Sequence, residues 1–240
     1  MYTELALSHG SVLWQSESAA SETIPADGCV DVILLDDELW IAGPSTQRIE
    51  THPDGETVTI GIRFAPGRAS EVLKVALADI RDTQALAQEL VGTRHARKIE
   101  QAMRAFVISI EPHQTTRLAL PWSLQSGDWV QIVRGEARRQ TALPDVAHKL
   151  GWSERHLHRH MTASFGYGYP TLVRIERARH AQSLISGGEK LGVTASMSGY
   201  ADQSHMNREL LRFVGMTPGQ LAASSAYKST ELPSGSSRVA

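Results

Sequence analysis

Hydrophobic and polar residues follow two different periods along this chain, and the change between them indicates how it folds. Residues 29–35 and 39–42 are short apolar runs with β-branched side chains, which is typical of strands. Residues 57–64 alternate apolar with small or polar side chains, and a turn sequence at 52–55 stands before them. A turn followed by such an alternation is typical of a β-hairpin.

The period becomes helical after Pro66. Apolar residues recur three and four positions apart near residues 72–77, 86–90 and 99–107, which predicts helices behind the β-structure. The segment 111–126 interrupts this pattern with prolines and polar residues, and helical spacing then resumes. We therefore expect an α+β fold, with a small N-terminal β-structure followed by helices and a C-terminal all-α part.

The chain has 240 residues, enough for two cores of ordinary size. The expected parts are an N-terminal domain at 1–112, a linker at 113–126, a second domain at 127–228 and a flexible tail at 229–240. No apolar run approaches the ~20 residues that a membrane helix needs, and the N-terminus lacks the pattern of an export signal. We expect a cytoplasmic protein with no membrane partner.

The C-terminal part contains an internal repeat. In a helix-turn-helix unit, a small residue lets two helices approach, a glycine adopts the left-handed turn conformation, and an aromatic residue anchors the second helix. A shift of 48 residues pairs Ala147 with Ala195, Gly151 with Gly199, Trp152 with Tyr200, Phe165 with Phe213 and Pro170 with Pro218. The repeat therefore predicts two helix-turn-helix units.

The apolar spacing places the helices of these units. They are expected at 143–150 and 153–165 in the first unit, at 193–198 and 202–214 in the second, and at 170–186 between the units. Ser153 is the expected N-cap of its helix, and Gly187-Gly188 ends the connecting helix. Two such units in one rigid body can enter successive major grooves about 34 Å apart.

Charge separates the two parts of the chain. Residues 1–140 carry 13 Lys and Arg against 19 Asp and Glu, a formal charge of −6, within a chain whose net charge is −2. Residues 141–228 carry 10 against 6, a formal charge of +4. A basic part joined to an acidic one favours double-stranded DNA as the partner of the basic part.

The second helix of each unit carries side chains suited to DNA. Arg can bind guanine through two hydrogen bonds, Gln and Asn can bind adenine, and His and Ser can contact bases or phosphates. The alternative for each residue is that it only forms part of a solvated polar surface and does not bind DNA. This alternative is least favoured for Arg159 and Arg208, which occupy equivalent positions in the two units. The candidate DNA-binding residues are Ser153, Glu154, Arg155, His158 and Arg159 in the first unit and Gln203, Ser204, His205, Asn207 and Arg208 in the second.

Residues 141–221 resemble the DNA-binding domain of the AraC/XylS family of transcriptional regulators. The resemblance is strongest in the sequence GYADQSHMNRELLRFVGMTPGQL at residues 199–221 and in RIERA at 174–178. It implies a seven-helix domain of two units that activates or represses promoters, often through contact with RNA polymerase. It also implies that Arg155, His158 and Arg159 enter one groove, and Gln203, Ser204, His205 and Arg208 the next.

Two features depart from the family pattern. The first helix of the second unit is unusually polar, with Ser198 where an apolar residue is expected. In the first unit, the segment that follows the second helix, residues 166–169, is short. The polar helix leads us to question the stability of the second unit or the strength of its contacts with DNA.

Three N-terminal segments resemble the regulatory domains of some family members. They are Pro25–Asp31, which contains one inserted residue, Gly43-Pro44, and Arg63–Gly67. The resemblance implies a small, cupin-like β-barrel followed by helices. If this domain senses a small-molecule effector, the aromatic and cationic residues Trp40, Arg48 and Arg63 are the candidate ligand-binding residues. The alternative is a dimerisation or protein-interaction module without a ligand. If the module serves dimerisation, the partner is a second copy of the chain in a homodimer.

The residues do not assemble into a catalytic or metal site. The four N-terminal histidines lack the close spacing of a cupin metal site, and His156, His158 and His160 are expected to point in different directions on one helix. There is no Gly-rich phosphate loop and no Gly-x-Ser-x-Gly elbow. Cys29 is the single cysteine, expected to be a buried thiol, and it excludes a multi-cysteine methyl acceptor. We expect no enzyme, no cofactor and no metal.

Overall fold

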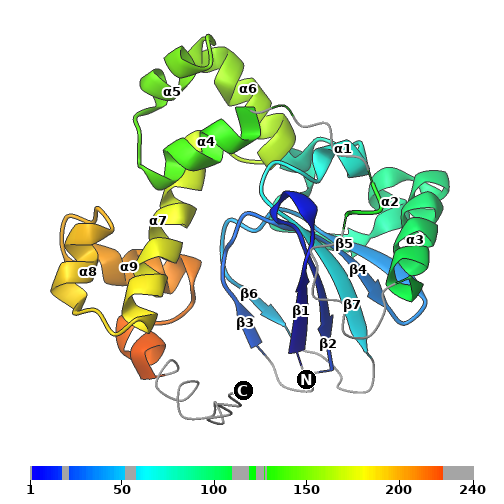
Figure 1. Ribbon diagram of the computed structural model, residues 1–240, viewed down its shortest axis with the longest axis horizontal. Coiled ribbons are helices and arrows are strands. Elements are labelled where there is room, and N and C mark those ends of the chain that lie inside the picture. Colours follow the sequence, from blue (N-terminus) through cyan, green and yellow to red (C-terminus); the bar gives the residue numbers. More distant parts are fainter. Residues whose placement is uncertain are drawn as a thin grey trace, which may run out of the picture.

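The structure is a computed structural model with an N-terminal part built on a β-sheet and a C-terminal part built from helices (Figure 1). It describes residues 2–17, 22–51, 58–109, 119–122, 127 and 129–223. Most of the predicted linker and the whole predicted tail lie outside these residues. The described elements confirm the predicted α+β fold class.

Eight strands among the described residues form the N-terminal β-structure. Six are antiparallel in one sheet, in the order β1 (Tyr2–Ala6), β2 (Val12–Ser16), β7 (Thr59–Phe64), β4 (Val30–Leu35), β5 (Glu38–Ala42) and β8 (Gln84–Leu86). The other two, β3 (Glu22–Ile24) and β6 (Ile49–Thr51), form a separate antiparallel ribbon.

The predicted hairpin before residues 57–64 is not formed. The turn sequence 52–55 lies outside the described residues, and the strands on its two sides belong to different sheets, because β6 pairs with β3 whereas β7 lies between β2 and β4. The physical reason is burial: the central position in the larger sheet buries Ile62 and Phe64 completely. A two-stranded hairpin with the three-residue β6 offers no comparable core.

One face of the larger sheet packs against the trailing helices. These are α1 (Ser70–Leu73), the 3-10 helix η2 (Leu77–Ile80), α2 (Ala87–Val91) and α3 (Thr93–Ile108). Alternate residues of β4 point to this face, which gives the strand its regular pattern of buried and half-buried positions. The core formed there contains Val32, Ile41, Ile62 and Phe64 from the sheet and Leu73, Ile99 and Met103 from the helices.

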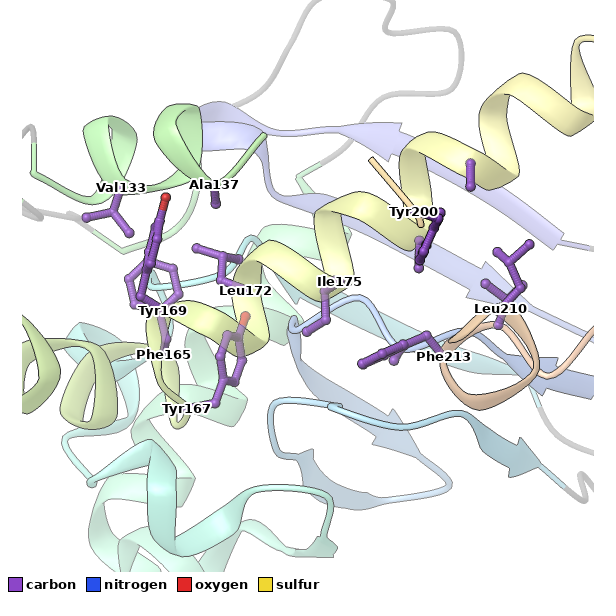
Figure 2. Close-up of a cluster of buried hydrophobic side chains, with 14 of the residues drawn as sticks. Val133, Ala137, Phe165, Tyr167, Tyr169, Leu172, Ile175, Tyr200, Leu210 and Phe213 are labelled. Carbon is purple, nitrogen blue, oxygen red and sulfur yellow. The ribbon is translucent and has the colours of Figure 1, made fainter. Parts of the chain in front are cut away.

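Helices form the C-terminal part around the longest of those described, α7. They are α4 (Trp129–Arg138), α5 (Leu143–Lys149), α6 (Glu154–Phe165), α7 (Tyr169–Ser186), α8 (Leu191–Met197) and α9 (Gln203–Phe213). Residues 218–223 are helical as well, which gives seven helical segments among the described residues of this part. Figure 2 shows side chains of α4, α6, α7 and α9 gathered along α7, with Leu172 and Ile175 of α7 buried between them. The helix pairs α5–α6 and α8–α9 therefore share one continuous core.

Candidate nucleic-acid interface

The two helix pairs repeat the same turn. Gly151 and Gly199 both adopt positive φ, +67° and +75°. In each pair the amide that follows the glycine, from Trp152 or Tyr200, donates at 2.9 Å to the carbonyl oxygen of the residue five positions earlier. Those acceptors are the equivalent buried alanines, Ala147 and Ala195. Residues that the sequence repeat pairs therefore perform the same structural role.

Both second helices begin at a side-chain N-cap. The hydroxyl of Ser153 accepts a hydrogen bond from the amide of His156 at 3.2 Å, as predicted, and Asp202 caps α9 by accepting from the amide of His205 at 2.7 Å. An N-cap leaves the other amides of the first helical turn directed outward, and this end of a helix favours anions. Each cap is thus compatible with a phosphate beside the helix.

Arg159 and Arg208 occupy matching positions on the two helices. Arg159 lies two residues after the buried Leu157 of α6, and Arg208 two residues after the buried Met206 of α9, so both point away from the core. The turn before α9 is one residue longer than the turn before α6, which makes this pair match at 49 residues. Their guanidinium groups are exposed, and that of Arg159 lies 3.2 Å from Nδ1 of His156.

The remaining candidates share this outward face, with one exception. His205 is half-buried, and its ring meets the ring of Tyr200 edge-on at 5.3 Å. The hydroxyl of Ser153 is exposed but serves the N-cap. The exposed candidates are Ser153, Glu154, Arg155, His158 and Arg159 beside α6 and Gln203, Ser204, Asn207 and Arg208 on α9. The structure thus gives each helix a separate polar face.

Two of the three alternating histidines do not behave as predicted. His156 and His160 are one helical turn apart, and their ring centroids lie 4.4 Å apart, with the planes tilted by 34°, beside the ring of Trp152. They share one side of α6 because positions i and i+4 lie above one another, so only His158 points elsewhere. Burial, the neighbouring His156 and Arg159 all lower the pKa of His160. The signal missed in the sequence was the pairing of His156 and His160 with Trp152.

Polar side chains tie the second unit to the rest of the helical part. Arg174 of α7 donates two hydrogen bonds to the carboxylate of Glu209, at 2.7 and 2.9 Å, which raises the pKa of Arg174 and lowers that of Glu209. Arg177 donates to Gln140 at 3.0 Å, and Gln140 in turn donates to the carbonyl oxygen of Ser198 at 3.0 Å. Gln140 therefore links the end of α4 to the turn of the second unit.

The three candidate ligand-binding residues have different surroundings. Arg48 precedes β6 and donates to the carbonyl oxygen of Leu211 in α9 at 3.2 Å. Arg63 and Trp40 lie on one face of the larger sheet, opposite the helix-packed core, because Arg63 pairs with Asp31 and Trp40 pairs with Ile33 in the strand registers. The structure brings Trp40 and Arg63 to one surface and places Arg48 elsewhere.

Arg63 belongs to a network of half-buried charges. Its Nε atom lies 3.1 Å from Asp31 and 3.5 Å from Asp27, and Trp14 donates to Asp31 at 2.7 Å. Burial raises the pKa of Asp31 to about 6 against the opposing effect of Arg63. The thiol of Cys29 is buried as predicted, and burial with the nearby Asp27 and Asp31 raises its pKa. A thiol of this kind is a poor nucleophile.

No group of three or more His, Cys, Asp or Glu in the described part of the chain is arranged to hold a metal ion. Among the same residues, no helix is long and apolar enough to cross a membrane.

Comparison with known proteins separates the chain into the same two parts. Residues 146–224 match the model of a helix-turn-helix domain, and residues 8–85 match a domain of unknown function, DUF6597. The HTH-type transcriptional regulator RipA of Corynebacterium glutamicum is 30% identical over 108 residues, which are 43% of this chain and 33% of RipA. The chain therefore covers about a third of the length of this relative.

Two solved structures are among those similar to this chain. The C-terminal domain of AraT from Geobacillus stearothermophilus, a response regulator, is 19% identical, with a TM-score of 0.38 over 48% of this chain and 96% of that domain. ToxT from Vibrio cholerae is 13% identical, with a TM-score of 0.43 over 89% of this chain and 97% of ToxT.

Proposed function

We propose that this chain, whose residues 146–224 match the model of a helix-turn-helix domain, is a sequence-specific DNA-binding regulator of transcription of the AraC/XylS type. The observation that carries the proposal is the repetition of one turn, one N-cap and one outward-facing arginine in the two helix pairs. In this proposal α6 and α9 enter successive major grooves on one face of the duplex. Such a protein acts in the cytoplasm, and RNA polymerase is a further proposed partner.

The test uses the full chain and a labelled duplex from the region upstream of its own gene, with a scrambled duplex at the same salt concentration. Arg208→Ala is expected to weaken binding to a preferred duplex by about 1–3 kcal/mol if the arginine reads a base, and Arg159→Ala is expected to have the same effect when α6 lies in its groove. Gln131→Ala, at an exposed position of α4, is the control. An equal loss on the scrambled duplex would show that the arginines contact only phosphates. Unchanged binding in both variants would refute the proposal.

The N-terminal domain is proposed to modulate this activity. One form of the proposal is a small-molecule effector on the sheet face that presents Trp40 and Arg63, next to Trp14. The other form needs no ligand, and the contact of Arg48 with α9 favours it, because a candidate ligand group is already engaged by the helical part. A change in DNA affinity of the Trp40→Ala variant without any change in the Arg48→Ala variant would favour the effector.

A further inference from the structure

The segment that follows α6 is docked into the N-terminal domain. Tyr167 is buried, and its hydroxyl donates to the carbonyl oxygen of Gly28 at 3.2 Å. A Cβ atom on Gly28 would lie 2.0 Å from that hydroxyl, and one on Gly67 would lie 2.6 Å from the ring of Phe165. Both glycines also have positive φ, +67° and +82°. Any other residue at these two positions would push the parts away from each other.

Gly43-Pro44, the remaining segment that resembles regulatory domains, belongs to the same surface. A Cβ atom on Gly166 would lie 2.5 Å from Cγ of Pro44 and 2.8 Å from the carbonyl oxygen of Leu77 in η2. Gly28, Pro44 and Gly67 thus surround residues 165–167. We use the name glycine seat for Gly28, Pro44 and Gly67 together. The three segments that resemble regulatory domains therefore meet at one place, where the helical part docks.

A second contact holds the other helix pair. The amide of Ala26 donates to the carbonyl oxygen of Phe213 at 2.6 Å, and the side chain of Ala26 is buried in the helical core. Arg48 contacts the carbonyl oxygen of Leu211 in the same helix, α9. The N-terminal domain therefore contacts the helical part near the C-terminal ends of both α6 and α9 (Figure 1).

Docking in this position places η2 beside the outward face of α6. That face and the loop into η2 line a cleft of about 680 Å³. Arg155, His158 and Arg159 stand on one side, and Ala76, Ala78 and Asp79 on the other. A cleft of this volume is the size of a small-molecule site, whereas a helix in the major groove must have both phosphate backbones beside it. The carboxylate of Asp79 also repels phosphates from this cleft.

We infer that the N-terminal domain holds the chain in a closed arrangement, in which residues 76–79 keep the duplex from α6 while α9 remains accessible. In this arrangement residues 165–167 are docked in the glycine seat, and they must leave it before the first unit can enter a groove. This inference rests on the proposed function, since it assigns a regulation to the DNA-reading face of α6. It predicts that the two equivalent arginines contribute unequally to binding by the unmodified chain.

The test uses Gly28→Ala in the full chain to weaken the docking of residues 165–167. Gly92→Ala is the matched control, because Gly92 also has positive φ, +77°, but a Cβ atom there has no neighbour within 4 Å. Each background is combined with Arg159→Ala or Arg208→Ala. The probe is a fluorescent duplex of random sequence, about 40 base pairs long, titrated over a range of salt concentrations because each phosphate contact adds about 0.9 to the salt slope.

In the unmodified chain and in Gly92→Ala, we expect Arg208→Ala to weaken binding at least threefold and Arg159→Ala less than 1.5-fold. Gly28→Ala should bind the duplex more tightly, with a steeper salt slope, and should become sensitive to Arg159→Ala by threefold or more. Equal sensitivity to both arginine substitutions in the unmodified chain would overturn the closed arrangement and leave the proposed function intact. Insensitivity to both in every background would mean that the proposed function itself fails.

A second measurement covers the case in which Gly28→Ala does not fold. Arg155 and Ser204 each stand two residues before the first buried residue of their helix, so Arg155→Cys and Ser204→Cys form a matched pair. The native Cys29 is buried and does not compete for reagent. A bulky maleimide polymer should label Arg155→Cys at least fivefold more slowly than Ser204→Cys. Equal labelling rates would overturn the inference.

Discussion

Ser198 shows how a single polar side chain affects the second helix pair. Ser198 and Thr194 are completely buried, and their hydroxyl groups have no hydrogen-bond partner among the described residues. A buried polar group without a partner costs about 1–3 kcal/mol. The sequence raised the question of stability in this unit, and these two buried hydroxyl groups are the structural feature that bears on it.

We expect Ser198→Ala to increase the free energy of unfolding by about 1 kcal/mol, because it removes an unpartnered hydroxyl and keeps the Cβ atom. Denaturant unfolding of the full chain measures the change. Ser196→Ala, at an exposed position of the same helix, is the control and should change stability by less than about 0.5 kcal/mol. A destabilised Ser198→Ala variant would mean that the hydroxyl is hydrogen-bonded in solution.

Local residue chemistry was readable where the partner is close in sequence. Ser153 caps α6 and Gly187 ends α7 as predicted, because each acts on the backbone within a few residues of itself. The ring cluster of Trp152, His156 and His160 was not predicted although its members are close in sequence, because the three alternating histidines were expected to point in different directions. The bridge made by Gln140 had no local signal, because Ser198 is 58 residues away.

At the level of elements, the relation between the two helix pairs depends on Gln140. It accepts from Arg177 of α7 and donates to the turn before α9, and a Cβ atom on Gly199 would lie 2.5 Å from its side-chain oxygen. The glycine of the second turn therefore serves two purposes: it allows positive φ and leaves room for this amide. The two units are joined by side chains as well as by α7.

We expect Gln140→Ala to lower the free energy of unfolding by about 1–2 kcal/mol, because two hydrogen bonds between elements are lost. The loss should appear first in α8 and α9, as faster hydrogen exchange of their backbone amides than in α5 and α6. Gln131→Ala, exposed on α4, should leave both exchange patterns unchanged. Uniformly faster exchange in all four helices would contradict the assigned role of Gln140 as a link between the units.

Strand pairing was the least predictable property of the elements. The apolar runs that became β4, β5 and β7 were recognised, but the partners of β7 were not, because the strands that flank it, β2 and β4, precede it by tens of residues. The helices of the repeat were predicted to within two residues at each end. Helical hydrogen bonds join neighbours in sequence, whereas the pairing of distant strands depends on the whole sheet.

At the scale of the whole molecule, the hydroxyl of Tyr167 is a specific link between the two parts. Tyr167→Phe removes its hydrogen bond to Gly28 and keeps the ring packed. We expect the amides of residues 26–29 to exchange hydrogen about fivefold faster, because a lost hydrogen bond of about 1 kcal/mol weakens the docking of this segment.

Tyr169→Phe is the matched control for Tyr167→Phe. Its hydroxyl donates a similar hydrogen bond at 2.9 Å, but to Thr141 within the helical part. This variant should lose comparable stability without faster exchange at residues 26–29. Faster exchange there in both variants would show that the segment responds to general destabilisation rather than to loss of docking.

The sequence by itself determined the helix-turn-helix repeat, its caps and the outward polar faces of α6 and α9, because helical period, turn glycines and N-caps act over short separations. Only the tertiary structure decided the pairing of β7, the separate surroundings of Trp40, Arg48 and Arg63, and the place where the N-terminal glycines meet residues 165–167. These features join residues far apart in the chain. No pattern along a single sequence specifies which distant surfaces will pack together.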